Sequence, residues 1–370
     1  MKFTCEKTLL SNAINIAART VSPKSSLTAL EGLYLKADET LQITGFNLET
    51  GITVEVEAAV REAGEVIMPT RMFADIIRKL PDDTVSVQVD EKLRVQIRGG
   101  ISSFQIMASS ADDYPELPEV TKDRAVSLPQ SALRDLISGT IFAVSENQAK
   151  PIHTGCLMEV MGQSVTMVAV DGFRLARKTY HFDQPQDQVL GFVVPSPALK
   201  ELEKILTDSD ELCSFCLGDK HILFQVGSAT LVCRLLEGSF LDWRRVIPTN
   251  NPIKLVANVS ALTATLERVG LIVSEKFKSP VRCLFSKDMA DFRTTTTIAS
   301  AHDCCQLSGD GGEIEIGFNC KYLLDALKVL PTDEICLELS NGLSPIVMTP
   351  CDDKYDFAYM VLPVRLKAGE

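Results

Sequence analysis

Cysteine and histidine are the residues of this chain whose types could support zinc binding or redox chemistry. The only Cys-x-x-Cys spacing joins Cys213 and Cys216, within a segment from Glu211 to Leu217 that alternates like a strand. Positions three apart on a strand point to opposite faces of the sheet. A structural zinc site also needs a second ligand pair, and only His221 is near in the sequence. The pattern therefore predicts structural thiols.

The remaining candidates for chemistry are equally weak. Eleven cysteines are an odd number at irregular spacings, with no signal peptide before them, which predicts reduced thiols. The vicinal pair Cys304 and Cys305 diverges on a strand, and four histidines are scattered without a ligand spacing. The run Gly309 to Gly312 precedes a strand and lacks the lysine of a phosphate loop. We expect no metal, no cofactor and no catalysis.

Composition describes a soluble, folded protein. The chain has 370 residues, 45% apolar and 23% charged, which excludes a disordered or fibrous class. It contains no apolar run long enough to cross a membrane, and its first residues lack the apolar segment of a signal peptide, so we expect a cytoplasmic protein without membrane partners. The formal net charge of −12, taken as a bulk property, argues against a nucleic-acid binder.

An internal repeat sets the expected fold. Three segments, Val66 to Leu80, Phe192 to Leu206 and Ile314 to Leu330, each read as a strand followed by a helix and then another strand. Matching Pro69, Pro195 and Phe318 gives offsets of 126 and 123 residues. Three upstream helical patterns repeat as well, each bracketed by a leucine and a valine eleven positions later: Leu10 and Val21, Leu133 and Val144, Leu262 and Val273. Six phased elements predict three homologous domains at 1–120, 126–249 and 252–370.

Each domain is expected to be α+β, with two helices backed by antiparallel sheets. Helical segments place apolar residues at i, i+3, i+4 and i+7, while strand segments alternate, as from Leu93 to Ile97 and, after the Gly99-Gly100 turn, from Phe104 to Ile106. The six helical windows, 7–20, 71–80, 131–142, 197–206, 260–271 and 320–330, carry eleven basic and six acidic residues, a net charge of +5. The rest of the chain carries −17. A positive helical face attracts a polyanion without reading its sequence, while the acidic exterior repels stray nucleic acid.

Three longer motifs carry a resemblance to a known family. They are Val170 to Ala176 (VDGFRLA), Glu237 to Pro248 (EGSFLDWRRVIP) and Tyr359 to Leu366 (YMVLPVRL), supported by Met1 to Thr4 and Ser274 to Phe277. Together with the repeat, they closely resemble the bacterial DNA polymerase III beta subunits, the DNA sliding clamps, over essentially the whole chain. The resemblance implies a head-to-tail homodimer that closes six domains into a ring around duplex DNA and tethers the replicative polymerase. It implies no catalysis of its own.

The resemblance also implies partners and a partner-peptide pocket. The expected partners are double-stranded DNA, the DNA polymerase III catalytic subunit, the clamp-loader complex, and other proteins with a clamp-binding motif, such as repair polymerases, ligase and mismatch-repair proteins. The pocket would accept apolar and glutamine anchors of a short peptide between an apolar floor and a rim of arginines. Its positions map here onto His153, Val170, Gly172, Phe173, Arg174, Leu175, Leu241, Arg245, Val246, Pro345, Met360, Val361, Leu362, Pro363, Val364 and Arg365. This chain differs from common family residues at Phe173, Leu241 and Trp243, and Lys367 to Glu370 extend past the usual end.

Two further sets complete the expected sites. The residues expected to face DNA are Lys24, Arg71, Arg78, Lys79, Arg134, Asn147, Lys150, Lys200, Lys204, Arg268, Lys321 and Lys328. The expected dimer interface matches Phe104 and Ile106 of the first domain with Leu271 and Ile272 of the third. Two alternatives stay open at this stage. One is an enzyme built on the Cys-x-x-Cys or the glycine run, and the other is a repeat-built scaffold whose helical face meets solvent.

Overall fold

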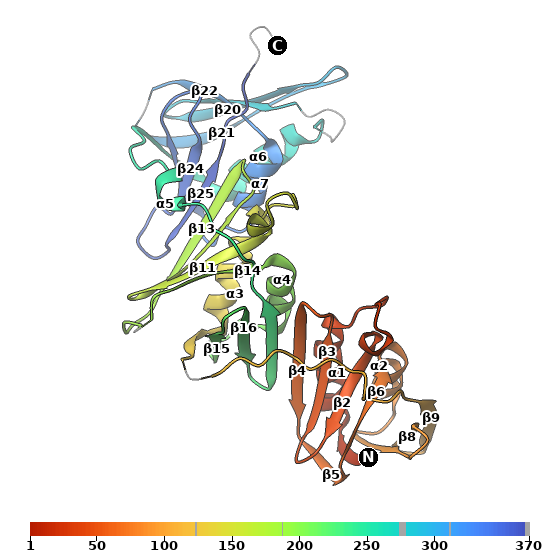
Figure 1. Ribbon diagram of the computed structural model, residues 1–370. Coiled ribbons are helices and arrows are strands. Elements are labelled where there is room, and N and C mark those ends of the chain that lie inside the picture. Colours follow the sequence, from red (N-terminus) through yellow and green to blue (C-terminus); the bar gives the residue numbers. More distant parts are fainter. Residues whose placement is uncertain (123, 187, 274–278, 311, 367–370) are drawn as a thin grey trace. The chain divides into compact units, whose positions relative to one another are not determined.

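The computed structural model describes residues 1–122, 124–186, 188–273, 279–310 and 312–366 (Figure 1). The motif Ser274 to Phe277 and the tail Lys367 to Glu370 therefore lie outside the described residues. The chain divides into two compact units, each discontinuous in sequence. Unit 1 comprises Met1–Leu133 and Pro197–Leu235, and unit 2 comprises Arg134–Ser196 and Leu236–Glu370. Each unit is described separately below.

Unit 1 contains two antiparallel sheets. The eight-stranded sheet has the order β10-β15-β16-β17-β4-β3-β2-β6 and the five-stranded sheet the order β5-β1-β7-β8-β9. The strands are β1 (Lys2–Glu6), β2 (Gly32–Ala37), β3 (Leu41–Phe46), β4 (Thr50–Val56), β5 (Ala58–Glu62), β6 (Gly64–Pro69), β7 (Thr84–Val89), β8 (Arg94–Gly99), β9 (Ser102–Met107), β10 (Val126–Pro129), β15 (Leu212–Leu217), β16 (His221–Val226) and β17 (Ala229–Arg234).

Unit 2 is built on one twelve-stranded sheet. Its order is β14-β11-β12-β13-β25-β24-β23-β18-β21-β20-β19-β22. The strands are β11 (Gly155–Met161), β12 (Ser164–Val170), β13 (Arg174–His181), β14 (Leu190–Pro195), β18 (Ile253–Asn258), β19 (Val281–Phe285), β20 (Met289–Thr295), β21 (Ser300–Asp310), β22 (Ile314–Phe318), β23 (Glu334–Leu339), β24 (Ile346–Thr349) and β25 (Phe357–Val361). Every pairing between the strands named here and above is antiparallel.

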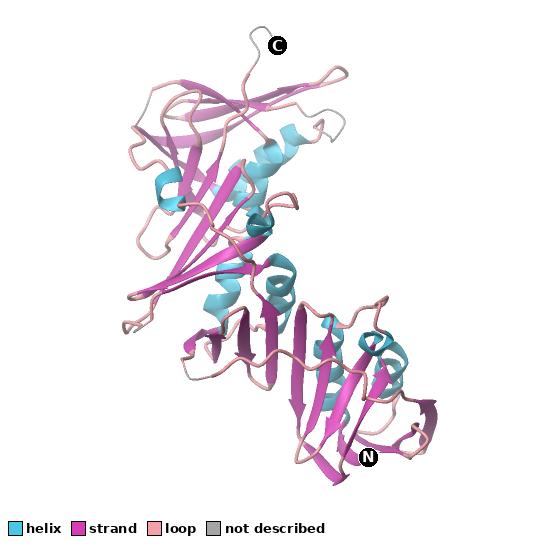
Figure 2. Ribbon diagram, in the orientation of Figure 1, coloured by secondary structure: helices cyan, strands magenta, loops and turns pink. Residues whose placement is uncertain are grey.

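Helices lie against these sheets (Figure 2), and all of those described except the four-residue α5 bury one apolar stripe. They are α1 (Lys7–Ala17), α2 (Thr70–Lys79), α3 (Gln130–Ser138), α4 (Ser196–Ile205), α5 (Trp243–Val246), α6 (Val259–Gly270) and α7 (Cys320–Leu327), and short 3-10 turns occupy Ala18–Thr20, Thr28–Glu31, Ile141–Ala143 and Pro151–Thr154. In α1 the buried residues are Leu10, Ala13, Ile14 and Ala17, the spacing that predicted the helix. Burying each leucine or isoleucine contributes roughly 1.5–3 kcal/mol. The α+β prediction is confirmed, while the short helix α5 was not foreseen.

The repeat recurs in the hairpin turns at the level of single hydrogen bonds. The side chains of Asn47, Asp171 and Thr296 each accept two backbone N–H groups, from the residues two and three positions ahead. The second donor is Thr50, Arg174 or Ala299, so these three residues are structural counterparts. Such turns favour short polar side chains because the side-chain oxygen replaces a backbone acceptor.

Two details of the sequence prediction are wrong. The counterpart of Pro195 in the third repeat is Asn319, not Phe318, because β6, β14 and β22 share one burial pattern and Asn319 caps α7 as Pro195 precedes α4. The second offset is therefore 124. Leu93 does not belong to a strand: its φ of 58° places it in the turn before β8. The apolar alternation of Leu93, Val95 and Ile97 continues through the turn, so it could not mark the start of the strand.

Candidate functional site

An apolar cluster in the unit 2 sheet contains three of the predicted pocket residues, Val170, Leu175 and Met360, and a fourth, Leu241, packs against it. Antiparallel pairing of β13 with β25 sets Arg174 opposite Val361 and Leu175 opposite Met360. Two predicted runs that lie almost 190 positions apart in the sequence thus become neighbours. We call the buried group the β13 cluster; it consists of Leu157, Val168, Val170, Leu175, Val193, Val347, Ala358 and Met360.

The segment before α5 covers part of the β13 cluster. Partly buried side chains packed against it are Ile152, Leu236, Phe240, Leu241, Trp243 and Ile247. The indole N–H of Trp243 donates to Glu159 Oε2 over 2.8 Å, and the Arg244 guanidinium lies 4.2 Å from the centre of the indole ring. Trp243 is the only tryptophan of the chain. Trp243 was not among the predicted pocket residues. The aromatic character of its segment, together with the apolar alternation of β12, could have indicated that it packs against an apolar surface.

Arg174 does not rim the cluster as an available cation. Its side chain is 9% exposed, with Nε 2.9 Å from Asp171 Oδ2 and Nη1 2.6 Å from Asp325 Oδ2 on α7. Its guanidinium also lies 4.5 Å from the centre of the Tyr322 ring. Two carboxylates and the face of an aromatic ring thus surround the guanidinium of Arg174 within the folded chain. In the single chain Arg174 is thus occupied by these partners, whereas Arg245 and Arg365 are exposed.

Aromatic residues extend the apolar surface at both ends. Phe173 is 60% exposed and stacks on Tyr322 with ring centres 6.1 Å apart. His153 packs edge-on against Phe240 at 5.4 Å. Burial, with a smaller contribution from Lys150, lowers the pKa of His153, so the neutral imidazole is favoured there. A neutral ring beside an apolar cluster suits packing rather than proton transfer.

The other predicted pocket residues lie in segments outside the β13 cluster: the Leu362 N–H donates to the Phe173 carbonyl, and Val364 bridges to Gly317 of β22. Gly172 has φ of 93°, a conformation that favours glycine, and no atom lies within 4 Å of the position of a Cβ there. Three predicted apolar residues keep exposed surface, whereas Val361 is buried within β25 and Pro345 and Pro363 are half-buried. The three exposed ones are Val246, Leu362 and Val364. An apolar floor with exposed aliphatic and aromatic edges can bind the side chains of a peptide.

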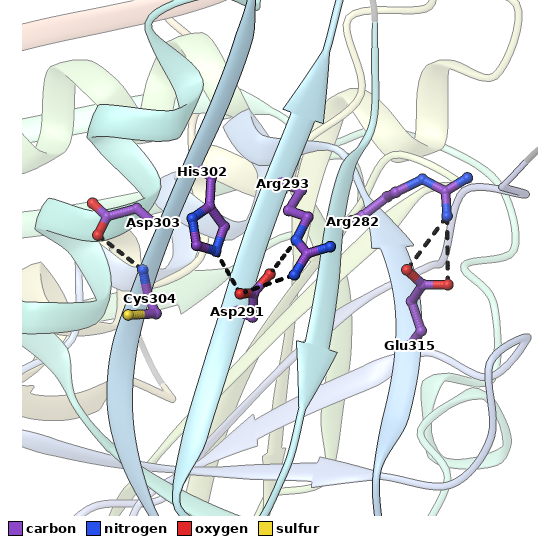
Figure 3. Close-up of polar contacts among 7 residues, drawn as sticks. All are labelled: Arg282, Asp291, Arg293, His302, Asp303, Cys304 and Glu315. Carbon is purple, nitrogen blue, oxygen red and sulfur yellow. Dashed lines mark hydrogen bonds and ion pairs between the residues drawn. The ribbon is translucent and has the colours of Figure 1, made fainter. Parts of the chain in front are cut away.

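The third repeat carries charges at two sheet positions that belong to the cluster in the second, those of Leu157 and Val168 (Figure 3). Register makes Arg282, Arg293 and His302 the counterparts of Leu157, Val168 and Arg177. Arg293 and His302 both bind Asp291, and Arg282 binds Glu315 (Figure 3). At these positions the third repeat therefore carries two arginines where the second has the apolar residues Leu157 and Val168.

The residues predicted to face DNA all have exposed side chains. Arg71, Arg78 and Lys79 belong to α2, Arg134 to α3, Lys200 and Lys204 to α4, Arg268 to α6 and Lys321 to α7; Lys328 caps α7, and Lys24, Asn147 and Lys150 lie in connecting segments. Four of these cations already pair with carboxylates: Arg78 with Asp75, Lys204 with Glu201, Arg268 with Asp303 and Lys328 with Glu267. Exposed pairs of this kind contribute little to stability and leave the cations accessible.

The residues predicted for the dimer interface differ in exposure. Leu271 is 82% exposed and Phe104 is 40% exposed, whereas Ile106, on β9, is buried and Ile272 is half-buried. Phe104 lies on β9, the outermost strand of its sheet. The exposed pair is the part of this set that a second molecule could reach.

Within the described ranges, no group of three or more histidine, cysteine or acidic residues could hold a metal ion. Cys213 and Cys216 are both buried, and burial raises the pKa of Cys213 to about 11. Cys304 is exposed and Cys305 buried, as alternation along β21 predicted. In the part of the chain that the structure describes, no helix has the length and apolar character needed to cross a membrane.

Sequence comparison decides the family. Profiles of the N-terminal, central and C-terminal domains of the DNA polymerase III beta subunit match residues 1–118, 127–242 and 244–365. The chain belongs to this family. It is 31% identical to the beta sliding clamp of Staphylococcus epidermidis, over 99% of both chains. Its fold matches the DNA polymerase sliding clamp of Bacillus subtilis with a TM-score of 0.93 at 28% identity, over 99% of this chain and 100% of that one. The DNA polymerase III subunit beta of Pseudomonas aeruginosa matches at 30% identity with a TM-score of 0.92, over the same shares.

Membership in this family defines the general activity of the chain. The chain is a sliding clamp: a non-catalytic processivity factor for DNA replication, with DNA and a polymerase as its partners. The enzyme alternative is thereby excluded, in agreement with the family assignment made from the three motifs.

Proposed function

We propose that two copies of the chain close head to tail into a ring around duplex DNA and hold the polymerase through the β13 cluster. The boundaries 1–120, 126–249 and 252–370 define the three domains of each copy. The ring is supported by two sheet edges that have no strand partner among the described residues. They resemble the two places where strands of neighbouring repeats pair within the chain; we call each such pairing a joint.

Both internal joints have the same construction. The second-repeat strand β17 pairs with β4 of the first repeat, setting Cys233 opposite Thr50. In the other joint, β25 pairs with β13, setting Val361 opposite Arg174. Thr50 and Arg174 are turn counterparts, so each joint aligns one strand that leaves a hairpin turn with the last strand of a neighbouring repeat.

The third joint has both halves but no internal partner. Strand β21 starts after the turn of Thr296, and it pairs with β18 only from Leu307 to Asp310. Along its preceding residues, no strand partner is described on that side. The last strand of the first repeat is β9, which pairs only with β8 among the described strands. Free edges of this kind invite pairing with another chain.

Carrying the register over predicts the contacts of the closed ring. Strands β9 and β17 both follow a two-residue turn that begins with a glycine of positive φ, Gly100 or Gly227, so Ser102 and Ala229 are counterparts. Phe104 of one copy then lies opposite Ala301 of the second copy, and Ile106 lies opposite Ala299. Exposed Phe104 and Leu271 become buried, and two such heterologous contacts close the ring.

Partner proteins would use one surface in each copy. The β13 cluster, flanked by exposed Phe173 and Val246 and by the segment from Leu362 to Arg365, offers an apolar floor for the anchors of a short peptide. We assign to it the polymerase catalytic subunit, the clamp loader, repair polymerases, ligase and mismatch-repair proteins. Partners that share one motif must compete for this surface. A cytoplasmic location, with the DNA, is part of the proposal.

Loading on circular DNA tests encirclement. Clamp loaded on a closed circle should remain bound at high salt and escape when the circle is linearised, because retention is topological. Retention on linear DNA with free ends at high salt would contradict the ring. If the protein were a scaffold that does not bind DNA, it would not be retained on the closed circle.

A further inference from the structure

A cleft of about 420 Å³, lined mostly by polar and charged residues, opens in unit 1 between the 3-10 turn Ala18–Thr20 and α4. Its lining residues are Arg19, Thr20, Asn47, Thr50, Pro197, Lys200, Glu201, Glu203 and Lys204. Two of them, Lys200 and Lys204, belong to the helical surface predicted to face DNA. The cleft is separate from the β13 cluster, which lies in unit 2.

Comparison with the other internal joint explains why the cleft is open. Thr50 lines it, and its counterpart in the next repeat is Arg174. There the long guanidinium side chain occupies the joint and pairs with Asp325 of α7. A threonine at the same place is too short to reach the helix, so the first joint keeps a cleft where the second is filled.

Three cations and two carboxylates determine what the cleft can hold. Glu201 receives Lys204 Nζ at 2.7 Å and Arg19 Nη1 at 3.6 Å. Lys200 is exposed and has no ion pair among the described residues. The Glu201 carboxylate therefore pairs with Arg19 and Lys204, while Lys200 nearby has no ion pair among the described residues. A phosphate group could accept hydrogen bonds from all three cations.

We propose that this cleft holds a backbone phosphate of duplex DNA, with Glu201 as an internal competitor. The assignment rests on the proposed function, because it needs DNA against the helical surface. Arg19, Lys200 and Lys204 donate to the phosphodiester, and Glu201 takes back Arg19 and Lys204 when the phosphate leaves. Competition of this kind shortens the lifetime of each contact between the protein and a phosphate, which suits a protein that must move along DNA.

Salt dependence of binding to a fluorescein-labelled duplex, followed by anisotropy at low salt, tests the cleft. Each phosphate contact contributes about 0.9 to the slope of log affinity against log salt, so Lys200→Gln should lower the slope by about that amount. Glu201→Gln should tighten binding by up to about fivefold, the range expected for relief of one exposed ion pair. Lys36→Gln is the matched control: Lys36 is an exposed lysine of β2 outside the cleft, and its replacement should change neither quantity.

The outcomes separate this inference from the proposed function. If wild-type protein is retained on circular DNA but Lys200→Gln and Glu201→Gln bind the duplex like the Lys36→Gln control, the cleft assignment fails alone. If retention on the circle is absent, the proposed function fails. Addition of ATP without DNA distinguishes a small phosphate ligand: saturable ATP binding that Lys200→Gln abolishes would overturn the assignment to duplex DNA.

Discussion

The guanidinium of Arg174 and the carboxylate of Asp325 meet at 2.6 Å, although 151 positions separate them in the sequence. Arg174 begins β13, and Asp325 lies on α7. Asp171 holds the other side of the same guanidinium. The ion pair thus links the strand of the second repeat to the helix of the third, next to the β13 cluster.

Replacing Arg174 should destabilise unit 2. Arg174→Ala leaves Asp171 and Asp325 without their shared partner, and breaking a buried pair by removing one member costs about 3–5 kcal/mol. Urea unfolding should show a lower midpoint. Arg245→Ala is the matched control, because Arg245 pairs with Asp242 while its side chain is 88% exposed. A wild-type midpoint for Arg174→Ala would show that the pair does not stabilise the joint.

A short peptide with glutamine and aliphatic anchors should bind at the β13 cluster and change the fluorescence of Trp243. The reporter needs no label, since Trp243 is the only tryptophan and packs against the cluster. Leu362→Asp places a charge on the apolar edge and should weaken binding at least tenfold, the usual scale for loss of an anchor contact. Leu212→Asp, at an exposed leucine on β15 of unit 1, should bind like wild type. Equal affinities for both variants would refute the mapping.

The sequence predicts the elements and the repeat well, because both depend on local periodicity. The stripe of Leu10, Ala13 and Ile14 and the alternation of β7 follow from burial of one face. The role of Arg174 is different. Its identity as a pocket residue followed from a motif, but its burial depends on Asp325 and Tyr322, which no local pattern connects to it.

Register was the other limit of prediction. A strand shows which residues face inward but not which strand lies beside it, so the pairings of β17 with β4 and of β13 with β25 could not be read from the sequence. The wrong match of Phe318 to Pro195 arose because proline was the marker used for the alignment. The third repeat has Asn319, not a proline, at the position before α7.

Charges placed at the free edges should prevent ring formation. Leu271→Glu adds a carboxylate to a side chain that is 82% exposed in the single chain and buried in the proposed ring. Sedimentation at micromolar concentration should give a dimer for wild type and a monomer for this variant, with unchanged circular dichroism. Leu343→Glu adds the same charge away from both edges and should stay dimeric. A dimer for Leu271→Glu would place the interface elsewhere.

Stability should fall as the pH decreases from 7.5 to 5.5. Burial is the main cause that lowers the pKa of His153 and His221, with nearby cations adding to it. The folded state therefore resists protonation. The resulting stabilisation is fully present above the unfolded pKa of about 6.5 and is lost as the pH falls through the lower folded values.

The double variant His153→Gln, His221→Gln separates the histidines from other groups. Its melting temperature should fall less than that of wild type over this range. The carboxyls of Asp291 and Asp303, whose pKa values are lowered, titrate below the range and add nothing to the difference. Identical pH profiles for both proteins would show that these imidazoles are not responsible.

Alkylation should distinguish structural from accessible thiols. Burial raises the pKa of Cys5 and Cys233 to about 12 and that of Cys213 to about 11, so these groups remain protonated at pH 8 and are shielded from reagent. Iodoacetamide should modify exposed Cys304 and Cys351 in the folded protein, as read by mass spectrometry. All eleven cysteines should react in urea. Modification of Cys213 in the folded protein at a rate matching Cys304 would mean that the Cys-x-x-Cys segment is accessible, and the case for purely structural thiols would not hold.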